Sequence, residues 1–561
     1  MFDWLVDLPT FVRESRIFPL TWFFPGPLLS RPPSRRLRRE RSRRFHSSEG
    51  IQMMRTQFTM RKKALAATVA AGLIISLTST VAPAQAAKDT LVLGSTQGMP
   101  QLNPIIQTFA AEVILWPLLW SGLTRRTADG TIKGDLAKSW TVNATGTVWT
   151  FKLTPGAKFS DGSPLDAKAV KAVFTYALDA KTISQRKSEI NMIKTIVPGK
   201  DLITFNLSKP NALFNEAVSD IRIIKTSEVA SFNTKPSTSG PFMISSFSPN
   251  VTLKLVRNPK YFGAPAKLKG INFVKTADPT AAVTSLRSGD IDFMYELPLS
   301  DATPLLSDKN LKIVKAAVSS IPVAWEYDLT SAPFNDIRVR QALAYAIDRA
   351  ALLKGAYYGF GSVSTFNTVV ADKNKWQCGA AAGLTQYSYN PEKAKALFAA
   401  AGVTGFTWWG VSGALPEFAA MGEILQSQLK AIGIDMKIEN NEVGTWAAKF
   451  YPQGKTYPGL LVPNYFSLQY EPAYSMYFLK SGGFESNWNN KEYDALYDKA
   501  IGTTDATARG KIWCEGMKLE NAQLAITSPF SFDKLHAARS NVMGAWVEGS
   551  GDIHLENVYI K

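Results

Sequence analysis

The segment from Met421 to Ile438 restricts the fold of this chain more than any other feature of its sequence. Its first part repeats apolar residues at helical spacing, at Met421, Ile424, Leu425, Leu429 and Ile432. Gly433 follows directly, and glycine readily adopts the left-handed conformation that ends a helix. The second part alternates as a half-buried strand does, at Ile434, Met436 and Ile438. A helix that ends in glycine and leads straight into a strand predicts an α/β unit.

Similar patterns recur along the chain. Two more segments place apolar residues on one face of an expected strand, at Trp149, Phe151 and Leu153, and at Val251, Leu253 and Leu255. Two more helices are expected behind the capping residues Asp166 and Asn390, and the second has Pro391 in its first turn and Gly402 at its end. Short strands interleaved with amphipathic helices predict α/β layers rather than a helical bundle or a β-sandwich.

The positive charge of the chain is concentrated at its amino end. The net charge is +17, but residues 1–86 hold 14 of the 63 lysines and arginines and five of the 46 acidic residues. The rest of the chain therefore carries 49 basic against 41 acidic side chains, a weak surplus for its length. No nucleic-acid partner is expected, because such a surface needs clustered cations. A length of 561 residues predicts two or three domains.

The first 86 residues resemble a targeting region rather than part of a folded domain. Residues 1–52 include an arginine-rich run without apolar periodicity, and we interpret them as a non-native leader ahead of a true start at Met53, Met54 or Met60. Residues 53–86 have the three parts of a signal peptide: a basic start, an apolar stretch and the small-residue site Ala84-Gln85-Ala86. Cleavage at this site predicts a mature chain that begins at Ala87.

A cleaved signal peptide predicts an exported protein that works in the periplasm, in the cell envelope or outside the cell. The alternative is a membrane-anchoring helix, but an apolar stretch of about 18 residues is marginal for crossing the bilayer. No cysteine lies near the cleavage site to carry a lipid, so the sequence leaves open how the protein is retained. Cys378 and Cys514 are the two cysteines of the chain, and either a disulfide or two buried thiols fits the sequence.

One segment resembles a known family. Residues 332–349 read APFNDIRVRQALAYAIDR, which is similar to the most diagnostic segment of extracellular solute-binding protein family 5, the oligopeptide- and dipeptide-binding-like components of ABC importers. Further segments resemble the same family in the same order, among them TFKLTPGAKFSDGSPLDAKAV from Thr150, TSGPFMISSFSPN from Thr238, LRSGDIDFM from Leu286 and NPEKAKALFAAAG from Asn390. Together the resembling segments extend over residues 90–530.

The resemblance implies an α/β fold of the two-lobed periplasmic-binding-protein type, with a hinge and an extra sub-domain on the first lobe. We expect the first lobe at residues 88–320 plus 531–561, its sub-domain at about 125–235, and the second lobe at 321–530. The implied function is extracytoplasmic capture of a peptide or similar small organic solute in an inter-lobe cleft, with delivery to the membrane subunits of an ABC permease. The implied protein is a monomer without a cofactor.

Residues for catalysis are sparse. The chain has three histidines, of which His536 and His554 lie near the carboxyl end, and none has the spacing of a zinc-binding helix. No catalytic residue and no metal ligand is therefore predicted, and we expect the protein not to be an enzyme. A secreted hydrolase remains the alternative class, and within the binding class the ligand could also be an oligosaccharide, an opine-like compound or a metal chelate.

The resemblance also indicates where a ligand would bind. Peptide binders of the family hold the ligand's α-ammonium with an aspartate a few residues before an acidic residue and a proline. The pair here is Glu471-Pro472, and Leu468 occupies the position of the aspartate. A free-amine peptide would lose a charge-assisted hydrogen bond there, worth about 1.5 to 3 kcal/mol, unless Glu471 or Asp328 replaces it.

Aromatic residues near this region are candidate cleft walls, because binding clefts combine apolar walls with few polar groups. The candidates in the second lobe are Trp408, Trp446, Tyr465 and Phe466, and those beside the predicted hinge are Trp325 and Tyr327. Met99, Gln101 and Asn103 follow the first expected strand and are the candidates from the opposite lobe. For each aromatic residue the alternative is an ordinary place in the core.

Overall fold

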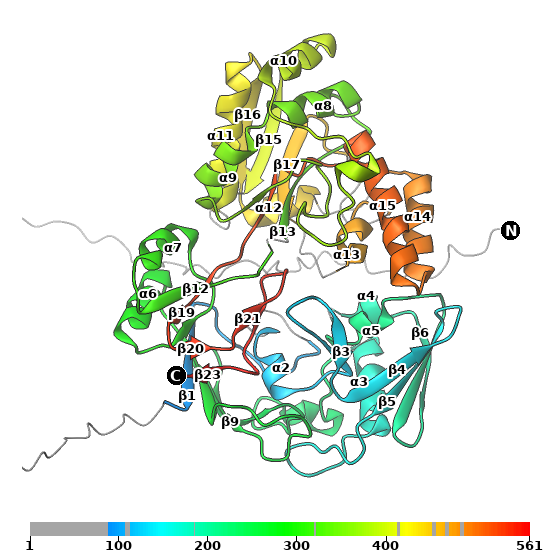
Figure 1. The fold of residues 1–561 in the computed structure, drawn as a ribbon, viewed down its shortest axis with the longest axis vertical. Coiled ribbons are helices and arrows are strands. Elements are labelled where there is room, and N and C mark those ends of the chain that lie inside the picture. Colours follow the sequence, from blue (N-terminus) through cyan, green and yellow to red (C-terminus); the bar gives the residue numbers. More distant parts are fainter. Residues whose placement is uncertain are drawn as a thin grey trace, which may run out of the picture. The chain divides into compact units, whose positions relative to one another are not determined.

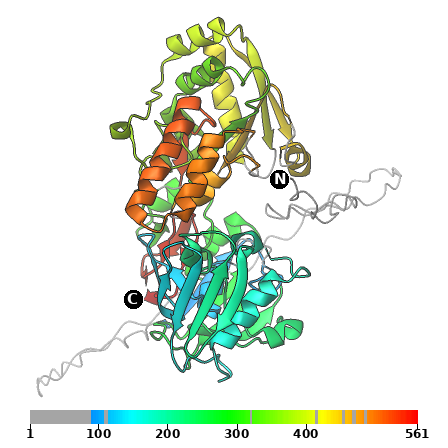
Figure 2. The same cartoon turned by 90° about the vertical axis from the view of Figure 1, so that its right-hand side faces the viewer.

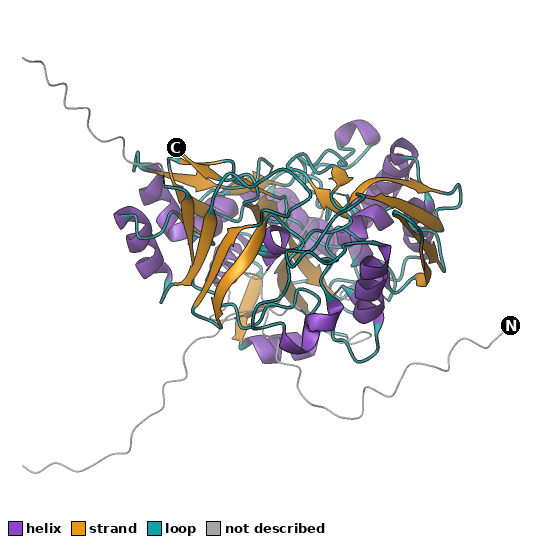
Figure 3. Cartoon of the chain, turned by 90° about the horizontal axis from the view of Figure 1, so that it is seen from below, coloured by secondary structure: helices purple, strands orange, loops and turns teal. Residues whose placement is uncertain are grey.

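The computed structural model describes residues 88–106, 113–184, 186–318, 321–411, 416–450, 456–465, 471–482 and 487–561. The predicted leader (1–52), signal peptide (53–86) and mature end at Ala87 lie outside the described residues, as do Phe466 and Leu468. The side chain of Tyr465 is also outside the description. The described part of the chain combines helices with strands, as the sequence predicts for an α/β fold (Figure 3).

A sheet of seven described strands forms the centre of the first lobe. Its order is β12-β19-β11-β1-β10-β9-β8. The strands are β1 (Thr90–Ser95), β8 (Phe242–Ser248), β9 (Thr252–Arg257), β10 (Gly270–Lys275), β11 (Phe293–Met294), β12 (Leu311–Val314) and β19 (His536–Arg539). The helices that connect these strands are α2 (Trp116–Leu119), α6 (Pro279–Ser288) and α7 (Leu299–Leu306). The sheet thus joins both ends of the described chain, because β11 pairs with β1 on one side and with β19 on the other.

A smaller antiparallel sheet lies within the predicted sub-domain. It contains β4 (Ala137–Val142), β5 (Val148–Leu153), β7 (Leu202–Leu207) and β6 (Ile193–Pro198), in that order (Figure 1). The accompanying elements are α3 (Ala167–Leu178), α4 (Lys187–Ile190), α5 (Phe214–Ala217), η1 (Thr226–Ser231) and the hairpin of β2 (Thr124–Arg126) with β3 (Ile132–Gly134). Trp149, Phe151 and Leu153 are buried on one face of β5, as their alternation predicts.

A sheet of six described strands forms the centre of the second lobe. Its order is β14 (Gly361–Val363), β18 (Phe530–Phe532), β13 (Ile321–Tyr327), β17 (Leu460–Tyr465), β15 (Gly405–Val411) and β16 (Asp435–Asn441). The helices around it are α8 (Ile337–Ala346), α9 (Arg349–Tyr357), α10 (Pro391–Ala400), α11 (Pro416–Ala431) and α12 (Val443–Phe450). The chain leaves this sheet after Phe532, two residues beyond the predicted boundary at 530.

A helical layer completes the second lobe. It contains η2 (Ala380–Ala382), α13 (Ala473–Tyr477), α14 (Lys491–Gly502) and α15 (Ala506–Gln523), and α14 and α15 pack side by side (Figure 2). A disulfide joins Cys378 to Cys514 with 5.7 Å between their Cα atoms, which resolves the choice that the sequence left open. The bond ties the loop around η2 to the middle of α15.

Local sequence signals fix most helix ends. Asp166 accepts hydrogen bonds from the backbone of Lys168 and Ala169 and begins α3, and Asn390 accepts one from Lys393 and begins α10. Gly433 has a φ of 84° directly after the helix that it was expected to end. The prediction for Val251 is wrong: this side chain is 58% exposed, because it lies in the turn that Asn250 makes at a φ of 58° before β9 begins.

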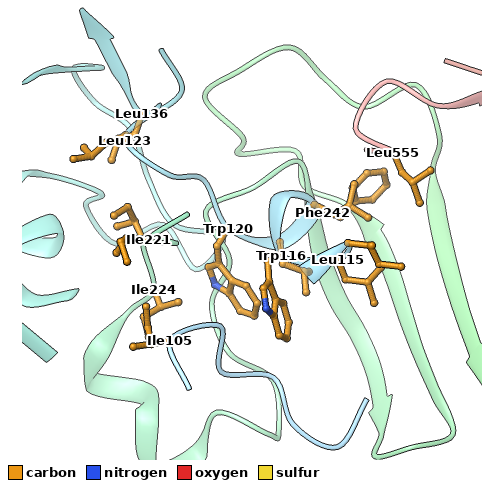
Figure 4. Packing of buried hydrophobic residues seen from close by; sticks show 14 of the residues in the cluster. Ile105, Leu115, Trp116, Trp120, Leu123, Leu136, Ile221, Ile224, Phe242 and Leu555 are labelled. Atoms are coloured by element: carbon orange, nitrogen blue, oxygen red, sulfur yellow. The ribbon is translucent and has the colours of Figure 1, made fainter. Parts of the chain in front are cut away.

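Tryptophans from one short helix organise the first-lobe core. Trp116 and Trp120 lie 5.6 Å apart, ring to ring, and both are at least 98% buried. Figure 4 shows them beside Leu115 and Phe242, with Leu555 from the carboxyl-terminal segment at the same cluster. That segment folds as short pairs of strands, β20 (Val542–Met543) with β23 (Tyr559–Ile560) and β21 (Trp546–Val547) with β22 (Ile553–His554). None of the described helices is both long and apolar enough to cross a membrane.

Candidate ligand site between the lobes

A cavity of about 440 Å³ lies between the two lobes, a volume within the range of about 300 to 1,000 Å³ that is usual for small-molecule sites. Its lining residues come from both lobes: from the first, residues 130–132, Trp140, Val142, Trp149, Ala212, Leu213, Asn215 and Glu216, and from the second, Lys375, Trp376, Glu471, Thr504, Ala506 and Arg509. Residues separated by several hundred positions in the sequence therefore form one site.

The two lobes touch directly beside this cavity. The backbone N–H of Ala212 donates to the carbonyl oxygen of Ile501 at 2.7 Å, and this bond connects the start of α5 to the end of α14. The indole of Trp149 donates to the carbonyl of the neighbouring Asn211 at 3.1 Å. Trp149 thus fixes the first-lobe segment that makes the contact, while its ring remains part of the cavity wall.

Glu216 is the acidic group of the first-lobe wall. It lies on α5, is 9% exposed, and its Oε1 accepts no hydrogen bond within the described part of the chain. Burial raises the pKa of the Glu216 carboxyl to about 7; Arg126 acts against this shift, and Glu471 across the cavity adds to it. The nearest cation, Arg126, donates instead to Asp220 at 2.8 Å. Glu216 therefore changes its charge close to neutral pH.

Glu471 is the acidic group of the second-lobe wall, and its carboxylate is already engaged. Arg509 holds it through two nitrogens, one to each carboxylate oxygen, and the indole of Trp513 donates to Oε1 at 3.0 Å. Arg509 also donates to the carbonyl of Thr503 at 2.7 Å, so the pair fixes the loop between α14 and α15. Glu471 lines the predicted site, in a buried, bidentate ion pair.

Trp376 forms the aromatic part of the second-lobe wall. Its ring packs against Gly510 of α15, where an added Cβ would lie 3.0 Å from the Trp376 ring. Its indole nitrogen is buried and donates no hydrogen bond to another described residue. The disulfide at Cys378, two residues further along, holds this loop on α15. An indole held in this way offers a ligand both a flat apolar face and a donor.

The predicted aromatic residues of the second lobe lie together, but in its hydrophobic core. Trp325 and Trp408 are fully buried and meet edge to face at 5.4 Å. Tyr327 stacks on Phe334 and donates its hydroxyl to the carbonyl of Leu524 at 2.7 Å. Trp446 donates to the carbonyl of Trp409 at 3.1 Å and is 7% exposed. None of these four residues lines the inter-lobe cavity described above.

The other predicted residues hold local structure. The side-chain amide of Asn103 donates to the Tyr176 hydroxyl at 3.1 Å, and its oxygen accepts from the backbone N–H of Ile105. The side chain of Gln101 accepts from the backbone N–H of Asn103. The backbone carbonyl of Met99 accepts from the backbone N–H of Asn250. Asp328, a candidate substitute for the missing aspartate, is 1% exposed and caps the turn that follows β13 through Thr330 and Ser331.

The sequence did not single out four residues of the cavity wall: Trp149, Glu216, Trp376 and Arg509. Trp149 was identified only as a strand residue, because the alternation around it says which face is buried and not what that face meets. Glu216 carries a signal that could have been noticed, since it is the one charged residue within the mostly apolar stretch ALFNEAV. Trp376 and Arg509 carry none, because their roles depend on a disulfide and on a contact between distant segments.

The ligand sets that metal ions need combine several His, Cys, Asp or Glu side chains. The described residues contain no cluster of three or more such side chains that could hold a metal ion. His554 lies between Glu548 and Glu556, 3.0 Å from the latter, and stacks on Trp546. Burial would lower the pKa of His554, but the two carboxylates raise it to about 10, so the ring stays a cation. Nδ1 of His536 accepts from the backbone N–H of Glu296 at 3.1 Å, and its Nε2 lies 2.9 Å from the carbonyl oxygen of Gly551.

Comparisons with known proteins agree with this architecture. Residues 131–488 match the family of bacterial extracellular solute-binding proteins, family 5 Middle. The chain is 27% identical over 474 residues to the probable D,D-dipeptide-binding periplasmic protein DdpA of Escherichia coli (strain K12). This match covers 80% of this chain and 89% of that protein. It is 28% identical over 390 residues to the nickel-binding periplasmic protein of the same organism, covering 64% of this chain and 72% of that one.

A solved structure has the same fold. HbpA2 from Haemophilus parasuis superposes with a TM-score of 0.75 at 20% identity, and the match covers 84% of this chain and all of that one. Two lobes around a cavity, the matching family and periplasmic relatives lead to one conclusion. The chain belongs to the bacterial extracellular solute-binding proteins of family 5, and it is the solute-binding component of an ABC importer.

Proposed function

We propose that this protein captures a small organic solute in the cavity between its lobes, closes over it and hands it to the permease unchanged. The observation that carries the proposal is the composition of the cavity wall, to which both lobes contribute. A ligand that touches both walls makes more contacts in the closed state than in the open one. This difference in contacts is sufficient to stabilise closure about a hinge. The lobes that would move are residues 88–320 with 531–561, and residues 321–530.

The ligand that we propose is a peptide or a peptide-like compound without an essential free α-ammonium. The relatives named above bind chemically different ligands, a D,D-dipeptide and nickel, so membership of the family does not choose between them. Three features support an uncharged or N-blocked ligand. Leu468 cannot accept a hydrogen bond, the Glu471 carboxylate is engaged by Arg509, and the Asp328 carboxylate is engaged by its own turn.

The proposed ligand contacts follow from the cavity wall. Trp149 and Trp376 offer apolar faces from opposite lobes, and Glu216 offers a buried carboxyl that can accept a hydrogen bond. We include three residues predicted from the sequence, which lie three to six positions before Glu471 in the chain: Tyr465, Phe466 and Leu468. Stacking on two indoles selects a ligand with a flat or apolar part.

We further propose that the signal peptide is removed after Ala86 and that the mature protein works outside the inner membrane. The names of the relatives, which are periplasmic proteins, support export. N-terminal sequencing of the exported protein should give Ala87 or a residue within two positions of it. A mature chain that still contains Arg61 to Lys63 would contradict cleavage.

The decisive experiment identifies the native ligand. The protein is purified without denaturation from cells grown in rich medium, and the compound released on unfolding is identified by mass spectrometry. Calorimetry with that compound should give one site, the compound should be recovered unchanged, and scattering should show a smaller radius of gyration on binding. Trp376→Ala should weaken binding by about 1 to 3 kcal/mol, with Trp546→Ala as a control outside the cavity. Tight binding without compaction would contradict closure, and a chemically altered compound would contradict a binding role.

A further inference from the structure

A second cavity, of about 380 Å³, lies wholly within the first lobe and its carboxyl-terminal segment. Its walls come from the β2–β3 hairpin, the turn at residues 219–222, the loop at residues 261–264 and the last strands of the chain. It shares no lining residue with the cavity between the lobes. Solute capture as proposed above therefore does not account for it.

Most charges that line this cavity are paired with one another. Arg126 donates from Nη1 to both carboxylate oxygens of Asp220, at 2.8 and 2.9 Å. His554 is held between Glu548 and Glu556, and its charge balances part of theirs. The other lining charges form a loosely held set, in which the one ion pair described is the 4.0 Å contact of Arg222 with Asp220. That set contains three cations, Arg125, Lys138 and Arg222, and one carboxylate, Asp135.

Arg222 is the most buried member of this loosely held set. It is 9% exposed, and its guanidinium makes no hydrogen bond with any residue that the structure describes. Its nearest carboxylate is Asp220 at 4.0 Å, and that group is already bound by Arg126. A guanidinium carries five N–H donors in a fixed plane, and burying it without acceptors is costly. The Arg222 nitrogens are not among the fully buried atoms without a partner, so an acceptor in the cavity can reach them.

The remaining charges favour an anion over a cation as the source of those acceptors. Arg125 and Lys138 are exposed at the cavity wall and form no salt bridge with another described residue. Asp135, the carboxylate of the loosely held set, accepts a hydrogen bond from the backbone N–H of Gly122 at 2.9 Å. Burial raises the pKa of Asp135 to about 6, and Arg222 and Arg125 act against that shift. Within this set three cations thus face one weakly acidic group; Asp220 and Glu556 also act on Arg222, but Arg126 and His554 hold these two carboxylates.

We propose that this first-lobe cavity is a second binding site, which takes the oxyanion of a small solute, either a carboxylate or a phosphate. Arg222 binds the oxyanion at the bottom of the cavity through its planar donors, a geometry that suits both groups. Arg125 and Lys138 add positive charge at the wall. The site is separate from the solute cavity, so both can be occupied in one molecule.

Calorimetry on the mature protein tests this proposal, with inorganic phosphate and acetate as probes at constant ionic strength set by sodium chloride. One site is expected, and the probe that binds more tightly identifies the oxyanion. Arg222→Gln should weaken binding tenfold or more, because charge-assisted hydrogen bonds are lost. Asp135→Asn should tighten it severalfold, because the opposing charge is removed. Arg287→Gln, an exposed arginine on α6, is the matched control and should change nothing.

Melting curves of each variant show whether it is folded. If Arg222→Gln does not fold, Lys138→Gln provides the test, since its side chain is exposed and its loss should weaken binding severalfold. Binding of the native solute between the lobes should be unaffected by either change. Wild-type protein that binds neither probe, or variants that bind both as the wild type does, would overturn the proposal.

Discussion

Arg126 and Glu216 lie 3.6 Å apart, nitrogen to oxygen, a long ion pair in which Oε1 of Glu216 accepts no hydrogen bond within the described part of the chain. The same arginine is 2.8 Å from Asp220, where burial opposes ionisation but Arg126 and Arg186 lower the pKa. Arg126 thus helps to keep Asp220 ionised. Its longer contact with Glu216 leaves that carboxyl, on the wall of the inter-lobe cavity, with a pKa of about 7.

Glu216 should make stability depend on pH. Its pKa rises from 4.5 to about 7 on folding, so the folded state binds the proton more tightly than the unfolded state. The stability that results is complete below pH 4.5 and is lost as the pH rises through 7. Between these values the free energy of unfolding of the wild type should fall by about 1 to 3 kcal/mol relative to Glu216→Gln.

Urea unfolding of both proteins at pH 4.5, 6 and 8 measures this difference. Glu439→Gln, which changes an exposed acid on β16, serves as the control and should follow the wild type. A constant difference between wild type and Glu216→Gln across this range would show that Glu216 titrates at an ordinary pKa in the folded protein.

The caps and strand faces were predictable from the sequence because each depends on neighbouring residues. Asp166 and Asn390 cap helices through backbone groups two or three residues away, so their surroundings in the chain suffice. The cavity was not predictable in the same way. Trp149 and Trp376 meet the same cavity from different lobes, whereas Trp325 and Trp408, which look alike in sequence, meet each other in a core. Apolar periodicity reports burial and does not say what the buried face touches.

Removing the disulfide should destabilise the second lobe. The bond closes a loop of 136 residues, for which the chain-entropy relation gives about 5 kcal/mol, and measured losses are commonly about 2 to 4 kcal/mol. Cys378→Ser with Cys514→Ser should therefore unfold at a lower urea concentration than the wild type. The double variant should also bind the native solute more weakly, because Trp376 is no longer held on α15. Equal solute affinity in the folded double variant would mean that packing on Gly510 alone positions the indole.

A substitution at Leu468 should change the ligand specificity of the protein. Leu468→Asp supplies the carboxylate that peptide binders of the family place there, so affinity for free-amine dipeptides should rise by about 1.5 to 3 kcal/mol. N-acetylated forms of the same dipeptides should gain nothing, which makes them the control. Calorimetry with both sets decides the matter. Wild-type protein that already binds free-amine dipeptides tightly and rejects the acetylated forms would point to another carboxylate, and Glu471→Gln would be the next variant.

Gly422 of α11 should tolerate no side chain. A Cβ added there would lie 2.8 Å from Nε1 of Trp408, a rigid and fully buried ring, so Gly422→Ala should cost about 1 to 3 kcal/mol. Gly516 of α15 is the matched control, because the atom its Cβ would approach is the flexible end of Met476. Gly516→Ala should be neutral or stabilising, since alanine favours helices by about 1 kcal/mol over glycine. Equal losses in the two variants would show that the Trp408 ring can move.

The strand order of the first-lobe sheet has a consequence for the chain during its synthesis. Among the described strands, β12 has one neighbour, β19, and β19 also connects to β11 and through it to β1. The second-lobe sheet needs no strand beyond Phe532, whereas the first-lobe sheet needs His536 to Arg539. The chain is synthesised from its amino end, so β1 of the first lobe is made early. The first-lobe sheet nevertheless becomes complete only after the second-lobe sheet, because it needs β19. In an unfinished chain that lacks β19, strands β11 and β12 therefore both present an unpaired edge, because β19 is the strand that lies between them.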